Sequence, residues 1–87
     1  MAIKPVPSGS LPIYVMNVPI TERWDYDGNS NMTYHGVAVP GSATSAAVWF
    51  IEKYTYDGNN RATLHQLADG NDQADNIWDD RASLSYS

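Results

Sequence analysis

The fold is decided by two matching segments, ERWDYDGNSNMTYHGVA at residues 22–38 and EKYTYDGNNRATLHQLA at residues 52–68. They align at an offset of 30 residues, and eight of the 17 positions are identical. The identical pairs are Glu22/Glu52, Tyr26/Tyr56, Asp27/Asp57, Gly28/Gly58, Asn29/Asn59, Thr33/Thr63, His35/His65 and Ala38/Ala68. Two copies are too few for a solenoid, so the repeat predicts two equivalent supersecondary units packed in one small domain.

Each copy has the pattern of a β-hairpin. Residues 20–26 and 50–56 alternate between two faces, and a period of two is typical of a strand. Tips at Asp27–Asn31 and Asp57–Arg61 are rich in residues that favour chain reversal, and return strands are expected after them. Either a two-residue turn centred on Asp-Gly or a longer turn ending in a bulge at Asn fits these tips. Gly58 is expected to adopt positive φ, so that Gly58→Val would cost more than about 1 kcal/mol.

The fold class predicted from this pattern is mainly β. We expect a small antiparallel sheet domain built from two repeated β-hairpins, at about 20–38 and 50–68, with a short helix near 72–81. The helix rests on Ala74, Ile77, Trp78 and Arg81, which recur at three- and four-residue spacing. Residues 40–49 are expected to form a loop with one helical turn capped by Thr44 or Ser45, and residues 82–87 a last strand.

The length of 87 residues fits a single domain with a marginal core. Residues 1–10 are expected to form an extended arm, and residues 11–87 one β-rich domain that contains the repeat. Prolines near both ends of Leu11–Ile20 predict that this apolar strand either lies at a sheet edge or pairs only between the two prolines. The chain has no cysteine, which excludes a disulfide scaffold, a thiolate zinc site and a cysteine nucleophile. Oligomerisation is therefore the expected source of additional stability.

Charge and composition exclude several function classes. Ten acidic and five basic side chains give a net charge of −5, the wrong sign for an autonomous binder of nucleic acid or of an anionic membrane. No stretch approaches 18 apolar residues, and the first ten residues lack the apolar run of a signal peptide. Synthesis in the cytoplasm is therefore expected.

A cluster of oxygen-bearing side chains at Asp25–Asn31 suggests a calcium loop, because hard cations take oxygen ligands at alternate positions. Against the EF-hand template the glycine comes two positions early and the twelfth position is Gly36 rather than Glu. The second copy begins with Thr55 and loses the first ligand. A hairpin turn is therefore the favoured interpretation of this cluster.

The only histidines, His35 and His65, occupy equivalent positions in the repeat. A pair brought together could bind a metal or act as a pH switch; the favoured alternative is that each packs on a sheet face beside Thr33 or Thr63. Carboxylates also crowd the C-terminal segment, where a solvated helix face or a complement to a basic partner is more typical than an acid/base pair. These carboxylates are Asp69, Asp72, Asp75, Asp79 and Asp80.

No pattern in the chain marks a catalytic serine, a phosphate loop or a dinucleotide site. We therefore predict a protein that is not an enzyme, with no catalytic, cofactor-binding or metal-ligating residue, no cofactor and no small-molecule substrate. Aromatic residues are more informative. Trp49 and Trp78 are expected in the core, whereas Tyr26 and Tyr56, beside the turns, could form an exposed stripe for a protein or a sugar.

Residues 40–49, 51–60 and 77–87 resemble small proteins encoded among the structural genes of tailed bacteriophages. The similarity runs from about Trp24 to the C-terminus, and the closing WDDRASLSYS is its most specific part. The repeated YTYDGNNR is also similar to the Tyr-Asp repeat of large secreted shell proteins, which string many copies together.

The phage resemblance implies a non-enzymatic structural component of the virion, in the capsid, neck, tail or fibre, made in the host cytoplasm. Its expected partners are further copies of itself or other phage structural proteins. The alternative is a carbohydrate- or receptor-binding β module that uses exposed aromatic side chains.

Overall fold

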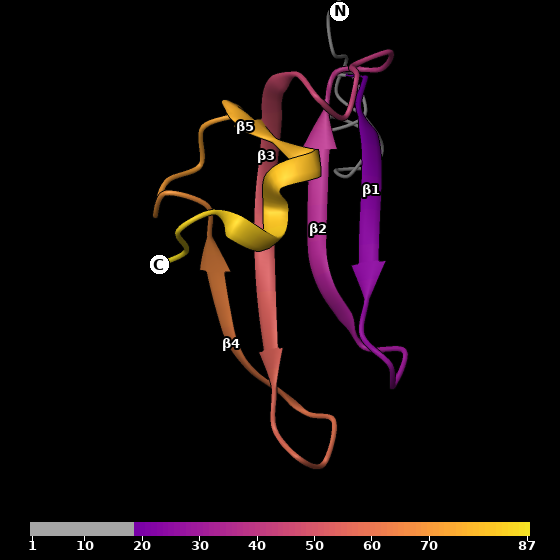
Figure 1. The fold of residues 1–87 in the computed structure, drawn as a ribbon, viewed down its shortest axis with the longest axis vertical. Coiled ribbons are helices and arrows are strands. Elements are labelled where there is room, and N and C mark those ends of the chain that lie inside the picture. The colour runs from indigo at the N-terminus through magenta and orange to yellow at the C-terminus, as the bar shows by residue number, and fades with distance from the viewer. Residues whose placement is uncertain (1–18) are drawn as a thin grey trace, which may run out of the picture.

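A single antiparallel sheet carries the fold of residues 19–87, which are the residues described by the computed structural model (Figure 1). The strand order is β1-β2-β3-β4, and β5 pairs with the N-terminal part of β3. The elements are β1 Thr21–Tyr26, β2 Met32–Ala38, β3 Ala47–Tyr56, β4 Ala62–Leu67, β5 Asn76–Ile77 and the 3-10 helix η1 Trp78–Ser83. The predicted mainly β fold is confirmed. The predicted arm at 1–10, and the predicted strand Leu11–Ile20 apart from its last two residues, lie outside the described residues.

Both repeats form hairpins, β1 with β2 and β3 with β4, in equivalent registers. Trp24 lies opposite His35 in the first hairpin, and Tyr54 lies opposite His65 in the second. The register shifts at the last residue of β1 and at the last residue of β3, which are equivalent positions. Because pairing and irregularity both repeat at the 30-residue offset, the hairpins are the two equivalent units predicted from the sequence.

Each hairpin tip is a three-residue loop organised by an aspartate. The Asp27 N–H donates to the Asn31 carbonyl (2.9 Å), and Asp27 Oδ1 accepts from the N–H groups of Asn29 (2.8 Å) and Asn31 (3.0 Å). Asp57 makes the equivalent bonds at the same distances in the second tip. These backbone donors hold the pKa of both carboxyls below its ordinary value. Of the two turns that the sequence left open, the longer one is observed.

The positive φ angles in these tips do not fall on glycine. Ser30 (φ 65°) and Asn60 (φ 61°) adopt the left-handed conformation, whereas Gly28 and Gly58 do not. The expectation for Gly58 is therefore wrong, and a Cβ at either glycine would meet no atom within 4 Å. The strained position is the third loop residue, where asparagine is tolerated better than serine.

Ser30→Asn is therefore expected to raise the free energy of unfolding by about 0.5–1 kcal/mol, because asparagine adopts positive φ more readily than serine. Asn60→Ala is expected to lower it by a similar amount, with Gly58→Ala as the control that changes it little. Urea denaturation followed by circular dichroism measures all three variants. A destabilised Ser30→Asn protein would contradict this account of the turn.

Antiparallel pairing of β2 with β3 joins the two repeats. His35 lies opposite Glu52 and Gly36 opposite Ile51 in this register. In the connection, residues 39–46, the Ser42 N–H donates to the Val39 carbonyl and the Ala46 N–H donates to the Ala43 carbonyl (both 3.1 Å). Two successive turns therefore stand where one helical turn was expected. The Trp49 indole N–H also donates to the Ala43 carbonyl (3.0 Å), which fixes the second turn to the start of β3.

The core lies on one side of the sheet, which we call the inner face. Its buried apolar residues are Ala38, Trp49, Ile51, Ala68 and Trp78. The Trp49 and Trp78 rings lie 5.9 Å apart between centroids, which confirms that both belong to the core. Gly36 lies directly beneath the Trp78 ring, where an added Cβ would come within 2.5 Å of Trp78 Cε3. Helix η1 covers the sheet here, in front of β2 and β3 (Figure 1).

The short helix predicted near 72–81 is present as the 3-10 helix η1, but it begins later than the sequence pattern indicated, at Trp78, and ends at Ser83. Residues 71–75 are irregular, β5 pairs with β3 through Ala47 and Ile77, and only then does η1 begin at Trp78. Buried Asn76 explains the difference, because its Nδ2 donates to the Trp49 carbonyl (3.0 Å) and places this residue in the sheet. Tertiary contacts thus override a local helical pattern.

The predicted last strand at 82–87 is reduced to one bridge, between Tyr86 and Ala68. Leu67 and Ser87 exchange two backbone hydrogen bonds beside it (2.9 and 3.1 Å). The Tyr86 hydroxyl donates to the Arg81 carbonyl (2.7 Å), and burial, with Tyr34 nearby, raises the pKa of Tyr86 to about 12. The C-terminus is thereby held against the C-terminal end of β4.

Candidate interaction surface

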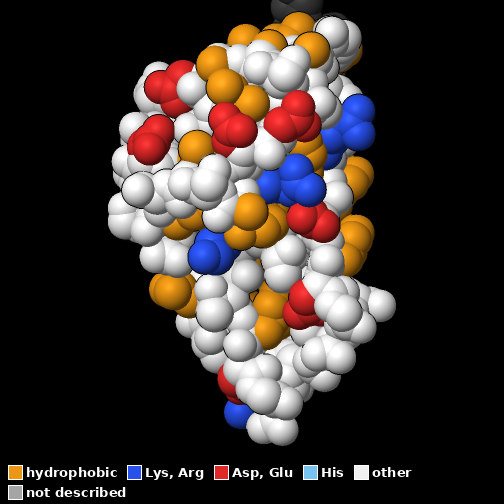
Figure 2. Space-filling model, viewed as in Figure 1, with side chains coloured by type: hydrophobic (Ala, Val, Ile, Leu, Met, Phe, Trp, Pro, Cys, Tyr) orange, Lys and Arg blue, Asp and Glu red, His pale blue; other side chains and the backbone are white. Residues whose placement is uncertain are grey.

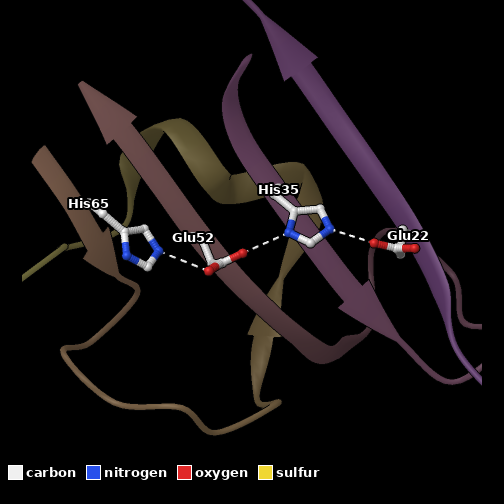
Figure 3. A network of polar contacts seen from close by, with 4 residues as sticks. All are labelled: Glu22, His35, Glu52 and His65. Atoms are coloured by element: carbon white, nitrogen blue, oxygen red, sulfur yellow. Dashed lines mark hydrogen bonds and ion pairs between the residues drawn. The ribbon is translucent and has the colours of Figure 1, made fainter. Parts of the chain in front are cut away.

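A row of four charged or titratable side chains crosses the outer face of the sheet, opposite the core. Because side chains alternate along a strand, Glu52 points away from the core to which its neighbour Ile51 contributes. Each of the four main strands contributes one residue, in the order Glu22, His35, Glu52, His65. We call this row the Glu–His ladder (Figure 3). It consists of two copies of the same pair, since Glu22 matches Glu52 and His35 matches His65 in the repeat.

Three short contacts run along the ladder. The Nε2 atom of His35 lies 2.7 Å from Glu22 Oε1, and its Nδ1 atom lies 2.6 Å from Glu52 Oε1. The other oxygen of Glu52 lies 2.8 Å from His65 Nε2. Figure 3 shows the four side chains lying end to end, so each strand is linked to the next by a polar contact.

His35 differs from His65 in its protonation requirement. Carboxylates can only accept hydrogen bonds, so His35, with a carboxylate oxygen at each ring nitrogen, must donate from both and is an imidazolium. Burial lowers the pKa of His35, but the hydrogen bonds and negative charges of Glu52 and Glu22 outweigh it and raise that pKa above its ordinary value. His65 contacts a carboxylate through Nε2 alone, which a neutral imidazole satisfies.

Aromatic rings stack on both histidines. The Trp24 and His35 rings lie 5.6 Å apart with 21° between their planes, and the Tyr54 and His65 rings lie 4.7 Å apart with 20°. Trp24 is nevertheless 49% exposed, and Tyr26 on the same strand is 57% exposed. The outer face therefore presents a polar row flanked by aromatic surface.

The two tyrosines of the predicted aromatic stripe differ in their exposure to solvent. Tyr26 is exposed, as that prediction requires, whereas Tyr56 is partly buried and its hydroxyl donates to the Met32 carbonyl (2.7 Å). The interpretation of the histidines as separate residues beside Thr33 and Thr63 is incomplete, because both contact Glu52.

The oxygen-rich cluster at Asp25–Asn31 is engaged in the turn and in an ion pair. Asp27 caps the turn, Asn31 Nδ2 donates to Asn60 Oδ1 of the neighbouring tip (3.0 Å), and Asp25 lies 3.0 Å from Arg81 Nε. Within residues 19–87, no group of three His, Asp or Glu side chains is arranged to hold a metal ion.

The C-terminal carboxylates are solvent-exposed. Figure 2 shows acidic side chains gathered on the upper part of the face that carries β5 and η1. The exposed aspartates of this segment are Asp69, Asp72, Asp75, Asp79 and Asp80. Asp79 and Asp80 belong to η1, which covers the inner face, so the acidic surface there is separate from the Glu–His ladder on the outer face.

The Glu–His ladder was not predicted from the sequence, although its signal was present there. Glu22 and Glu52 are identical in the repeat and share the face of Trp24 and Tyr54. Two hairpins laid side by side bring this repeated glutamate next to the repeated histidine. The register between the hairpins was the missing information.

In comparisons with protein-family models, curated proteins and solved structures, no match to this chain was found. None of the helices in residues 19–87 is long and apolar enough to cross a membrane.

Protonated His35 makes the stability of the sheet depend on pH. Its raised pKa stabilises the fold in full below pH 6.5, and this contribution is lost as the pH rises through the folded-state pKa. We expect the urea concentration at the unfolding midpoint to decrease as the pH is raised from 6 to 8.5. The decrease should be smaller in His35→Gln. An equal decline in His35→Gln would show that another group is responsible.

Proposed function

We propose that this protein is a non-enzymatic structural component of a tailed-phage virion that acts by protein-protein assembly. The observation that carries the proposal is the outer face, where Trp24 and Tyr26 stay half exposed beside the Glu–His ladder. Exposed apolar surface rimmed by polar groups commonly marks a protein interaction site. The resemblance of residues 77–87 to phage structural proteins supports the virion setting, with synthesis in the host cytoplasm.

Trp24→Ala in the phage genome tests this function. Trp24 contributes little to the core, so the variant should fold but enter particles at a clearly reduced copy number, measured by mass spectrometry of purified virions. Asp75→Ala, at an exposed position in the irregular segment 71–75, is the matched control. Absence of the wild-type protein from purified particles would refute the proposal.

A carbohydrate- or receptor-binding module is the second candidate, favoured by the exposed Trp24 ring lying flat on His35. Trp49 and Trp78 are buried, so a glycan on the outer face should change the fluorescence of Trp24. Titration with candidate glycans, with Trp24→Phe as the control, measures this directly. A saturable change in the wild type, lost in Trp24→Phe, would favour this candidate over assembly.

A further inference from the structure

The Glu–His ladder has two unlike ends. His35 and Glu52 in its middle each contact two ladder partners, whereas Glu22 on β1 and His65 on β4 contact one each. The group missing beyond His65 is a carboxylate, and the group missing beyond Glu22 is an imidazole. Each end of the ladder therefore presents the partner that the other end lacks.

The internal β2–β3 junction shows how such ends are joined. There His35 lies opposite Glu52 and Tyr34 opposite Lys53. The Tyr56 hydroxyl, which donates to the Met32 carbonyl, adds a further bond across the same two strands. In the repeat, β4 is equivalent to β2 and β1 is equivalent to β3. A junction between β4 of one copy and β1 of another would therefore reproduce this arrangement.

We propose that copies of this chain join head to tail, with β4 of one copy pairing antiparallel with β1 of the next so that His65 meets Glu22 of the neighbouring copy. This inference rests on the proposed assembly function and names its partner and its interface. The 30-residue offset sets the register: Leu64 lies opposite Arg23 of the neighbour, and Gln66 opposite Thr21. Such a heterologous contact generates a ring or an open filament.

The two strand edges are compatible with this pairing. Each step from β1 to β4 is antiparallel, so β4 of one copy and β1 of an identically oriented neighbour are also antiparallel. Leu67 turns its N–H and C=O away from β3 to Ser87, so His65, two residues earlier in the regular part of the strand, turns its own toward the same edge. Among residues 19–87, no strand pairs with β1 on its far side, and on the far side of β4 only Leu67, the last residue of the strand, is paired, with Ser87. Strand addition at open edges is a common mode of recognition.

Leu64 provides an apolar element at the proposed junction. It is 49% exposed, whereas its repeat equivalent Tyr34, at the internal junction, is partly buried beside the core. Pairing would place the aliphatic part of Arg23 of the neighbour against Leu64. Neither side chain forms a hydrogen bond or an ion pair within residues 19–87, so both can be changed without breaking a polar contact of the monomer there.

Charged substitutions at Leu64 and Arg23 test the junction. The extent of assembly of the full-length protein is measured by sedimentation velocity over a range of concentrations. Leu64→Lys places a like charge opposite Arg23 of the neighbour, and should raise the concentration for half-assembly about fivefold or more. Adding Arg23→Glu to the same chain creates an opposite-charge pair and should restore assembly. Asn71→Lys, the same charge at an exposed loop position, is the control and should assemble like wild type.

Three outcomes would overturn the head-to-tail junction. If wild type assembles and Leu64→Lys assembles equally well, the interface lies elsewhere and only the assembly function survives. If wild type is monomeric at every concentration yet present in virions, its partner is another protein. If it is monomeric and absent from virions, the proposed function fails as well.

Discussion

Trp49→Ala is expected to lower the free energy of unfolding by about 3–5 kcal/mol, the usual cost of truncating a buried aromatic residue. Trp49 is 0% exposed, its ring packs against Trp78, and its indole N–H donates to the Ala43 carbonyl. Truncation removes all three interactions and leaves a cavity between the sheet and η1. In a domain of this size, such a loss is comparable with the total stability.

Urea denaturation monitored by circular dichroism measures this effect without relying on the tryptophan that is removed. Trp24→Ala is the matched control, because the Trp24 ring is half exposed and rests only on the outer face. It should lose no more than about 1 kcal/mol. Equal losses in the two variants would mean that the core does not lie on the inner face.

Gly36→Ala is the second substitution with a large expected effect, about 2–3 kcal/mol of destabilisation from overpacking. The new Cβ would lie 2.5 Å from Trp78 Cε3, 2.7 Å from Trp78 Cζ3 and 3.2 Å from Trp49 Cε3. These are ring atoms of packed side chains, so relief requires η1 to move off the sheet. Gly36 is thus required because Trp78 approaches the backbone of β2, not because of its φ.

Gly28→Ala is the control for Gly36→Ala, since a Cβ at Gly28 would meet nothing within 4 Å. Thermal unfolding of the two variants should show a clear loss for Gly36→Ala and little change for Gly28→Ala. A Gly36→Ala protein as stable as wild type would contradict the placement of Trp78.

The hairpins could be predicted from the sequence because their determinants are local. The repeat marked equivalent positions, and Asp27 and Asp57 each satisfy turn N–H groups within four residues along the chain. The position of η1 could not be predicted in this way. It depends on Asn76 bonding to the Trp49 carbonyl and on Trp78 packing over Gly36, contacts that join residues far apart in the sequence.

Only part of the candidate surface could be predicted from the sequence. The repeated glutamate and histidine were visible as identical positions, but their contact depends on the pairing of one hairpin with the other. Residue spacing within one repeat says nothing about that pairing. The protonation of His35 could not be predicted from the sequence either, because it requires a carboxylate from each neighbouring strand.

Disulfide trapping tests the head-to-tail junction most directly, because the natural chain has no cysteine. A double variant, Arg23→Cys with Leu64→Cys, places thiols on β1 and β4 at positions that oppose each other only between copies. Within one chain, three strand spacings, roughly 14 Å, separate β1 from β4, well beyond disulfide reach.

Mild oxidation of this double variant is expected to give a regular series of covalent multimers on a non-reducing gel, whereas each single variant stops at a dimer. The series should collapse to monomer on reduction. A double variant that stays monomeric, or gives no species beyond those of the single variants, would contradict head-to-tail assembly through β4 and β1.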